Sequence, residues 1–411
     1  MIAGALLTTL LPLRDARERV VAYELRTHPG ARATAHDIDA EARAVLTLLQ
    51  SRELLRLARP RPLHVPITPV VLRGGAITGL ASADVVFTLA ADVLEDIECR
   101  RALDRYATAG FRFGFVVDNA SPRLPLLTGA LAGSWAAFDA SAIGSGLDVA
   151  TTVQRLLEAG ARPVARQVDD RATRERLRAG GVVAFGGRAL PRGRGASRSA
   201  RSRALAALTH LARHADGRPV EAELEQFVAS DPELLEALLR AVGPTAPNGG
   251  RPRSIGQAVM RLGREAMLDR LMIGTAFLLA ESAGSPDLAT IAIARARMLE
   301  QLGGALERTG HPRGRIAAGL LSCAEVATGL PALLLAEQLG LNAAMRDVVV
   351  ERATPLGALV DVVEAHESGW WDDLLTRTDA LGIAPAVIND AWRSALTDAR
   401  AEVAARPAAE G

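Results

Sequence analysis

Three carboxylate side chains stand at or near the ends of short apolar runs in the first half of the sequence: Glu24, Asp118 and Asp139. In a barrel of parallel strands, chemistry belongs at the carboxyl ends of the strands. Acids gathered there could hold a divalent cation that activates a water molecule. Hydrolysis with two metal ions needs several anionic ligands, and three acids are few. Glu24 and Asp118 can instead be hydrogen-bonded residues at strand ends, which is the interpretation we favour.

Histidine and cysteine offer weaker candidates for a metal site. His210 and His214 are four residues apart on an expected helix, so both could lie on one side of it. No acid or third ligand accompanies them, and we expect an exposed helical pair. Cys99 and Cys323 stand far apart without CxxC spacing, which excludes a disulfide framework or a zinc cluster. We expect both to be small buried residues.

Short apolar or β-branched runs must position these acids. Near-continuous apolar runs are typical of strands that are buried on both faces, as in parallel sheets. Helical spacing of apolar residues occurs between them, over residues 38–57 and 149–159. Eight strands with helical returns predict a TIM-like (β/α)8 barrel over residues 1–190. The eight runs are Ala3–Leu13, Val20–Leu25, Leu63–Thr68, Asp84–Ala90, Phe111–Asp118, Trp135–Ala140, Arg162–Val168 and Gly181–Phe185.

The second half of the sequence favours helices throughout. Asp231-Pro232 combines a capping carboxylate with a proline at the first helical position. Ser254–Gln257 is a candidate capping box, and Ser285-Pro286 opens a further helix. We therefore predict an all-α domain over residues 205–400 and a disordered tail over residues 401–411.

Residues 191–204 are expected to link the two domains. The stretch from Gly186 to Arg203 combines Gly, Ser and Pro with six arginines. Arginine clusters can neutralise the phosphates of a nucleic acid, so association through residues 192–203 is one hypothesis. No aromatic residue for base stacking is interleaved, however. We expect a solvated linker and no nucleic-acid partner.

Composition limits the remaining classes of function. The chain has 411 residues, of which 49% are hydrophobic and 3% aromatic, so its cores are built from Ala, Leu and Val. The formal net charge of +1 implies no general attraction to nucleic acid or anionic membranes. The apolar run Met1–Leu11 is too short to span a bilayer and is expected to be a buried strand. We place the protein in the cytoplasm, without a membrane partner.

The second apolar run reads Val20-Val21-Ala22-Tyr23-Glu24-Leu25. Its Tyr-Glu-Leu matches a form of the namesake motif of the EAL domain, the cyclic di-GMP phosphodiesterase barrel, and the first half resembles that domain in the bacterial variant that is joined to an HDOD domain. By this resemblance, an active site holds two divalent metals with acids and an asparagine, while a lysine and a glutamate handle the attacking water.

Most of the family's site positions are changed in this chain, although Glu24 is kept. The asparagine position falls on Pro66, and the fourth-strand glutamate falls on Thr88. The late glutamate falls on Arg166, which puts a cation where the family has an anion. The other positions fall on Asp118-Asn119 or Val117-Asp118 for the Asp-Asp pair, Ala137 or Phe138, just before Asp139, for the lysine, Gly186-Gly187 for the final Gln-Gly, and the vicinity of His28 for the phosphate-contacting arginine. The resemblance therefore implies a vestigial site without metal, cofactor or cyclic di-GMP.

The second half resembles an HDOD domain through several motifs in the family's order. Ser254–Gly263 matches its Ser-Ile-x-x-Ala-x-x-x-Leu-Gly signature, and Ala229–Leu235 matches its early Asp-Pro-x-Leu helix. The segments 295–300, 319–322 and 356–370 fit the form of EAL-HDOD fusions. In the parent HD fold an adjacent His-Asp pair holds a metal, whereas this chain has Ser322-Cys323. The resemblance implies that the metal site has been lost here too.

Four residues remain as candidates for contacts with partners. Arg297 and Glu300 can pair at i,i+3 on a helix surface or mark a contact between domains. Of Trp370 and Trp371, we expect one to pack in the core, while the other could anchor a partner.

The sequence thus predicts a catalytically inactive, cytoplasmic signalling scaffold of the EAL-HDOD type. It would act through contacts with other signalling proteins, with a homodimer as a further possibility. The alternative is a residual or ligand-sensing phosphodiesterase-like protein that uses Glu24, Asp118 and Asp139 with one metal.

Overall fold

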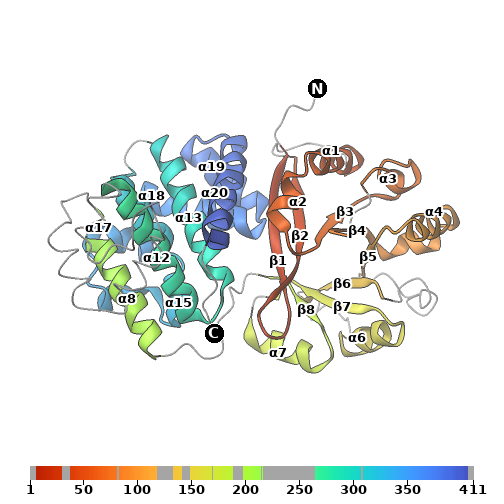
Figure 1. Cartoon of the computed structure of the whole chain (residues 1–411), viewed down its shortest axis with the longest axis horizontal. Coiled ribbons are helices and arrows are strands. Elements are labelled where there is room, and N and C mark those ends of the chain that lie inside the picture. Colours follow the sequence, from red (N-terminus) through yellow and green to blue (C-terminus); the bar gives the residue numbers. More distant parts are fainter. Residues whose placement is uncertain are drawn as a thin grey trace, which may run out of the picture. The chain divides into compact units, whose positions relative to one another are not determined.

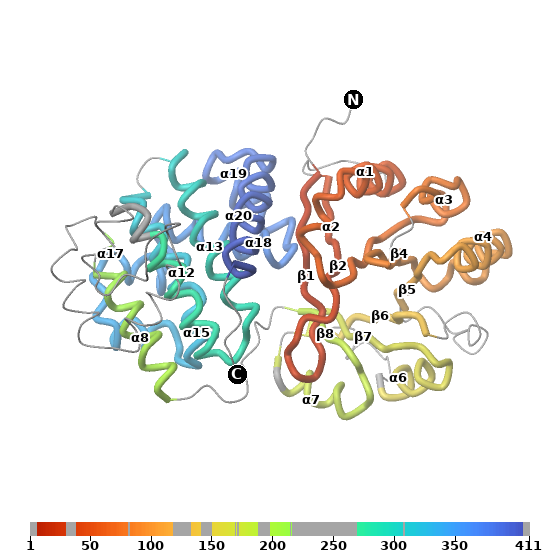
Figure 2. The backbone as a smooth tube through the Cα atoms, viewed as in Figure 1, coloured from red at the N-terminus to blue at the C-terminus, as the bar shows by residue number. Residues whose placement is uncertain are grey.

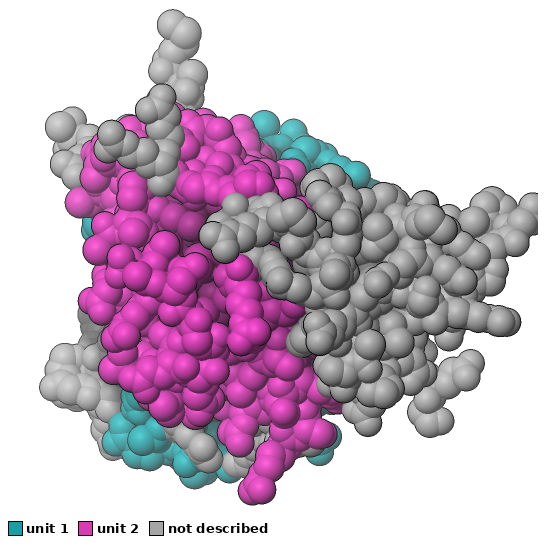
Figure 3. Space-filling model, turned by 90° about the vertical axis from the view of Figure 1, so that its left-hand side faces the viewer, with its two compact units in different colours: residues 1–189, 366–372 teal, residues 190–365, 373–411 magenta. Residues whose placement is uncertain are grey.

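The computed structural model describes residues 6–29, 38–80, 83–117, 133–140, 149–168, 170–187, 198–213, 215, 264–306 and 309–405. The chain divides into two compact units, which Figure 3 distinguishes by colour. Unit 1 comprises Met1–Ala189 together with His366–Asp372. Unit 2 comprises Leu190–Ala365 and Asp373–Gly411. Each unit is described by itself below.

Unit 1 contains a closed barrel of eight strands in sequential order (Figure 1). Every one of the eight predicted strands is confirmed, including the one predicted in the apolar N-terminal run. The strands from β2 to β8 pair in parallel. The strands are β1 Leu7–Arg14, β2 Val20–His28, β3 Leu63–Pro66, β4 Val85–Ala90, β5 Phe113–Val116, β6 Trp135–Asp139, β7 Arg162–Arg166 and β8 Ala184–Phe185.

The first strand departs from a uniform (β/α)8 barrel, because β1 runs antiparallel to both β2 and β8. A parallel connection needs a dozen or more residues, whereas only residues 15–19 join β1 to β2. Asp15 stabilises this short hairpin, since its carboxylate accepts the N–H groups of Arg17 and Arg19 at 2.8 and 3.0 Å. The tube in Figure 2 shows the chain turning back directly from β1 into β2.

Helices follow most of the later strands of unit 1. The helix predicted over residues 38–57 is interrupted, because Arg52 adopts a left-handed conformation with φ of 59°. Asp96 begins α4 by accepting the N–H groups of Glu98 and Cys99, which is the usual role of an N-cap carboxylate. The helices of unit 1 are α1 Ile38–Gln50, α2 Glu53–Ala58, α3 Pro69–Arg73, the 3₁₀ helix η1 Ala91–Glu95, α4 Ile97–Thr108, α6 Val149–Glu158 and α7 Arg171–Ala179.

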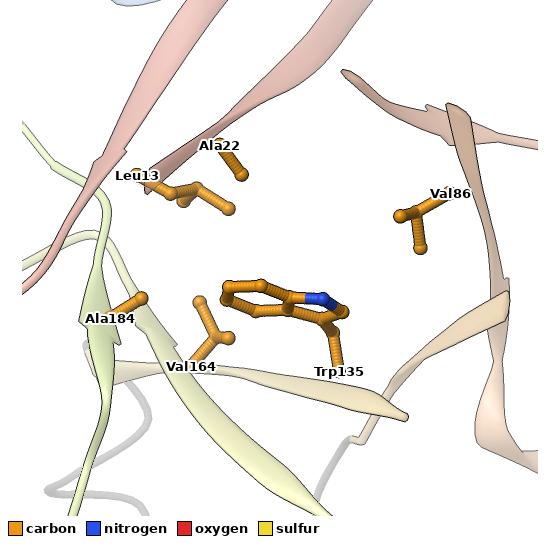
Figure 4. Packing of buried hydrophobic residues seen from close by; sticks show 6 residues of the cluster. All are labelled: Leu13, Ala22, Val86, Trp135, Val164 and Ala184. Carbon is orange, nitrogen blue, oxygen red and sulfur yellow. The ribbon is translucent and has the colours of Figure 1, made fainter. Parts of the chain in front are cut away.

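The interior of the barrel is filled by side chains from several strands, with Trp135 among them (Figure 4). Aliphatic residues from both neighbouring and opposite strands surround the indole. Burial of an aromatic side chain of this size dominates the local packing energy. The buried cluster consists of Leu13, Ala22, Val86, Trp135, Val164 and Ala184.

One titratable side chain lies beside this apolar core. His64 in β3 is 4% exposed, and its ring meets the ring of Trp135 edge-on at 5.0 Å between centroids. Its Nε2 atom has no hydrogen-bond partner in the described part of the chain. Burial, together with the positive charges of Arg112 and Arg162, lowers the pKa of His64 to about 3. The imidazole is therefore neutral at physiological pH.

In its described residues, unit 2 consists of helices joined by short turns and contains no strand, as the sequence predicts. A five-residue π-helix, η4, interrupts the pattern before the left-handed Arg352. The elements are α8 Arg198–Arg213, α12 Arg264–Ala283, α13 Asp287–Gly304, α14 Pro312–Leu321, α15 Ala324–Thr328, α16 Ala332–Gln338, α17 Ala343–Arg346, η4 Asp347–Glu351, α18 Pro355–Ser368, α19 Trp371–Leu381 and α20 Pro385–Ala405. Residues 366–372, at the junction of α18 and α19, group with unit 1.

Helix α13 forms the centre of unit 2 and packs against α12, α14 and α20. Its crossing with α14 depends on Gly319. A Cβ atom at Gly319 would lie 2.6 Å from the Cα atom of Ala296, so the two helix backbones meet where a side chain would separate them.

Two expected boundaries differ from the observed helices. Helix α8 begins at Arg198, so the end of the predicted linker is helical, with Ala200 and Ala204 buried. Helix α20 extends to Ala405, into the stretch expected to be a disordered tail. The motifs at Asp231-Pro232 and Ser254–Gly263 lie outside the described residues. No helix in the described ranges is long and apolar enough to cross a membrane.

We expect His64 to make the barrel sensitive to acid. Its pKa is lower in the folded state than the ordinary 6.5, so below pH 6.5 the unfolded chain binds a proton that the folded chain excludes. Stability should fall as the pH falls from 6.5 towards 3, by up to about 1.4 kcal/mol per pH unit from this group. His64→Leu should reduce the slope of unfolding free energy against pH, measured from urea unfolding midpoints between pH 6.5 and pH 3.

A matched control is available in Val65, the buried neighbour of His64 in β3, which carries no titratable group. Val65→Ala destabilises the barrel without changing the number of protons bound, and it should leave the slope unchanged. An unaltered slope in His64→Leu would contradict the assignment.

Gly319→Ala should destabilise unit 2 by about 1–3 kcal/mol, because the added methyl group has no room against the α13 backbone. Gly304→Ala serves as the control, since its Cβ would meet only the end of the Arg315 side chain at 3.6 Å. Thermal unfolding followed by circular dichroism measures both. Equal effects would show that the helix crossing tolerates a side chain.

Candidate functional site

The candidate site lies at the carboxyl ends of the barrel strands, where the sequence places its acids. Asp139 is the last residue of β6, and Arg166 is the last residue of β7. The two are direct partners in the register of these neighbouring strands. Glu24 lies in β2, which is separated from β7 by β8 and β1 in the order of the barrel.

The Arg166 guanidinium joins the two acids. Its Nε atom donates to Oδ1 of Asp139 at 2.7 Å, and its Nη1 atom donates to Oε1 of Glu24 at 3.3 Å. The side chains of Arg166 and Glu24 are 14% and 15% exposed, and that of Asp139 is 33% exposed. The side chain of Arg166 therefore reaches from β7 past β8 and β1 to β2. Its positive charge lies against both carboxylates, that of Asp139 and that of Glu24.

A second arginine adds to the positive charge at Glu24. The Nε atom of Arg26 lies 3.2 Å from the same Oε1 atom of Glu24. Burial by itself would lower the pKa of the Arg166 guanidinium, but Glu24 and Asp139 outweigh it and hold this pKa above its usual value. Arg166 is thus a permanent cation in this environment.

The other positions that the resemblance singled out add few donors. Pro66 is exposed at the end of β3 and has no side-chain donor. Thr88 in β4 aligns with Pro66 in the strand register and supplies one hydroxyl. Ala137 packs partly against the barrel core, and Phe138 is buried. Asp118 lies outside the described residues.

This donor set does not fit a pair of divalent cations. The two described acids face two guanidinium groups, so the cluster is already neutral. Clustered divalent cations would need further anionic ligands to offset their repulsion. Among the described residues, no three His, Cys, Asp or Glu side chains come together as metal ligands. We therefore derive no metal-dependent step at this mouth.

In unit 2, Ser322 and Cys323 lie between α14 and α15, and Cys323 is buried. Arg295 from α13 points at this place. Its Nη1 atom donates to Oγ of Ser322 at 3.0 Å and to a carboxylate oxygen of Glu364 at 3.1 Å. The Arg295 side chain is only 7% exposed. An arginine thus occupies the surroundings of the pair that the HD resemblance associates with metal.

Arg295 is one end of a larger network of charges in unit 2. Glu364 also pairs with Arg352, which lies 3.6 Å from Asp361, and Asp361 pairs with Arg377 at 2.8 Å. Burial raises the pKa of Asp361 against the opposing effect of Arg352 and Arg377. The network ties α13, α18 and α19 together around the left-handed Arg352.

Sequence reasoning missed Arg295, although its position gave a signal. It lies between Ala294 and Ala296 in a helix whose neighbouring positions are almost all buried. An arginine inside an apolar stretch of helix must find a charged or polar partner. Its acidic partner Glu364 is far away in sequence, so spacing alone could not identify the pair.

The remaining predicted residues have defined places. Arg297 pairs with Glu300 at 3.3 Å and also with Asp269 of α12. The expectation of an exposed helical pair is wrong for His210, which is 8% exposed in α8, a helix that packs against α12 and α14. His214 lies outside the described residues. Cys99 and Cys323 are free and buried, as predicted.

Trp370 directly precedes α19 and Trp371 is its first residue, and both lie within the segment that groups with unit 1. Both side chains are half-buried. The ring of Trp371 lies 6.2 Å from that of His28 and 5.8 Å from that of His366, measured between centroids. Trp371 is therefore engaged within unit 1, and the role of the pair in binding a partner stays a prediction.

Comparison with solved structures finds EAL-domain proteins. Klebsiella pneumoniae BlrP1 in complex with calcium and cyclic di-GMP is 18% identical, with a TM-score of 0.39, over 46% of this chain and 55% of that one. The EAL domain of Mycobacterium smegmatis DcpA is 20% identical, with a TM-score of 0.35, over 44% and 90%. Bacillus subtilis YkuI, with cyclic di-GMP and calcium, is 14% identical, with a TM-score of 0.37, over 64% and 74%.

The chain spans about half the length of the BlrP1 chain that it matches. No protein-family model matches the sequence, and no curated protein does. These similarities concern the fold alone.

Breaking the Arg166–Asp139 ion pair should cost stability. In a double-mutant cycle with Arg166→Leu and Asp139→Asn, we expect a coupling energy of about 1–3 kcal/mol, because both groups are largely removed from solvent. Urea unfolding of the four proteins gives this energy.

The exposed pair Arg73–Asp96, with side chains 41% and 37% exposed, provides the comparison. Arg73→Ala should cost less than about 1 kcal/mol, as is usual for surface ion pairs. Additive effects of the two changes at the mouth would mean that Arg166 does not bind Asp139 in solution.

Proposed function

We propose that this chain is a catalytically inactive signalling scaffold of the EAL-HDOD type, which acts through contacts with other proteins. The observation that carries the proposal is the Arg166 guanidinium, held at 2.7 Å from Asp139 and 3.3 Å from Glu24. Where a phosphodiesterase barrel needs cations held by acids, this chain supplies its own tethered cation. A divalent ion would have to displace a buried arginine from both of its partners.

The helical unit supports the same proposal independently. A metal-dependent HD enzyme needs imidazole and carboxylate ligands, whereas Ser322 and Cys323 offer a hydroxyl and a buried thiol. Arg295 brings a positive charge to 3.0 Å from the Ser322 hydroxyl, and this charge would repel a metal ion. The assignment of residues 205–400 to the HDOD class belongs to this proposal and rests on the sequence motifs.

The alternative is a ligand-sensing or residual phosphodiesterase. Structures named above contain cyclic di-GMP, and Glu24 and Asp139 lie at the barrel mouth as a site of that kind requires. The asparagine and glutamate positions fall on Pro66 and Thr88, and the lysine position falls on Ala137 or Phe138, which weighs against this alternative. We therefore favour the scaffold.

Metal binding tests the proposal directly. Isothermal titration of the wild-type chain with Mn²⁺ should give no stoichiometric binding. In Arg166→Gln the two acids lose the cation that they share, while Arg26 stays beside Glu24, and weak Mn²⁺ binding should become measurable, at least about tenfold tighter than the detection limit that bounds the wild type. Adding Glu24→Gln to that variant should abolish it.

Turnover of cyclic di-GMP with Mg²⁺ or Mn²⁺ completes the test. The wild-type chain should not exceed the rate in buffer. Stoichiometric Mn²⁺ binding by the wild type, or hydrolysis that Glu24→Ala removes, would contradict the proposal. Saturable binding of cyclic di-GMP without hydrolysis would favour the sensor alternative.

A further inference from the structure

Helix α16 in unit 2 has an exposed apolar face. Leu335, Ala336 and Leu339 turn inwards and are buried. Leu333 and Leu334 lie on the opposite face and are 48% and 40% exposed. Two neighbouring leucines on one short helix form a continuous apolar feature, unlike a single exposed leucine, which needs no explanation.

Acidic residues lie on this helix and on the segments next to it. Glu337 follows Leu333 by four residues, so it lies on the same exposed face. The carboxylate of Glu325 accepts the N–H of Ala332 at 2.7 Å, directly beside the start of the leucine pair. The π-helix η4 packs against α16 and carries Asp347 and Glu351, both exposed.

Positive charges nearby do not balance these acids. From residue 324 to 351, the sequence contains four acidic residues and one basic residue, Arg346. Arg201 of α8 lies at the edge, where it donates to the carbonyl of Thr328 at 3.5 Å. Arg352, the next basic residue, is held by Glu364 and Asp361. The whole chain has a net charge of +1, whereas these residues concentrate negative charge next to the exposed leucines.

We propose that this α16 surface, formed by Leu333, Leu334, Glu325, Glu337, Asp347 and Glu351, is the docking site for a basic amphipathic segment of another protein. The leucines would bury the apolar side of the segment, and the acids would pair with its arginines or lysines. The negative charge of the surface favours a basic segment over a second copy of this chain. A second copy of this chain that used the same face would bring acid against acid.

The proposal deepens the scaffold function and rests on it, because it names the chemistry of one partner. The probe is a fluorescent synthetic peptide of about 14 residues, with leucines at helical spacing and arginines elsewhere. A peptide with glutamate in place of arginine is its counterpart. Fluorescence anisotropy with the full chain should show saturable binding of the basic peptide and no saturable binding of the acidic one. The affinity for the basic peptide should fall as the salt concentration rises.

Variants assign the binding to this surface. The double variant Leu333→Ser/Leu334→Ser and the single variant Glu337→Lys should each weaken binding about tenfold or more. Val387→Ser is the matched control, since Val387 on α20 is 46% exposed in the same unit, and it should have no effect. Circular dichroism confirms that all the variants fold.

Several results would overturn the proposal. They are no saturable binding of the basic peptide, equal binding of the acidic peptide, or equal losses in the Val387 control. Dimerisation of the chain in analytical ultracentrifugation that Leu333→Ser/Leu334→Ser abolishes would assign the surface to a second copy instead. Failure here leaves the scaffold proposal standing, because metal binding and turnover at the barrel mouth test that proposal separately.

Discussion

The ion pairs that the Arg166 guanidinium makes with Asp139 and Glu24 determine the chemistry of the barrel mouth. Carboxylates that are largely removed from solvent are costly unless something pairs with them. In a hydrolytic barrel that role falls to bound metal ions, which then perform chemistry. Here a side chain performs it permanently, since an arginine does not lose its proton in this environment. We propose that the same ion pairs that stabilise the barrel mouth also take up the carboxylate oxygens that a metal ion would need.

The helical unit repeats this arrangement in a different fold. Arg295 lies buried against Ser322 and Glu364, and the charge network continues outwards through Arg352 and Asp361. Both units thus contain an arginine where their resemblances associate a metal. A buried ion pair contributes little net stability compared with apolar packing. Removing one partner is nevertheless strongly destabilising, because the other charge is left buried and unpaired. Such pairs therefore hold neighbouring elements in one arrangement, which suits a protein whose proposed role is recognition.

Much of the fold could be predicted from the sequence, because local patterns determine it. All eight apolar runs became strands, since residues such as Val85–Ala90 read as strands buried on both faces. The hairpin from β1 to β2 escaped prediction, because the apolar pattern of β1 does not reveal its direction and only the short connection does. The break at Arg52 depends on one residue in a left-handed conformation, which propensity does not foresee.

The candidate site was only partly predictable, for a related reason. The charge reversal at Arg166 was visible in the sequence, and so was the survival of Glu24. The bridge that Arg166 makes between Glu24 and Asp139 was not visible, because Arg166 and Glu24 are 142 positions apart in sequence and two strands lie between theirs in the barrel. Likewise, the burial of His210 depends on the packing of α8 against α12.

The most direct measurement is a crystal structure of the wild-type chain soaked in Mn²⁺, with anomalous diffraction data collected near the manganese edge. We predict that the Arg166 guanidinium lies between the carboxylates of Asp139 and Glu24, with no anomalous peak at the barrel mouth. A well-occupied manganese ion bound by Glu24 and Asp139, with the arginine side chain turned away, would contradict it.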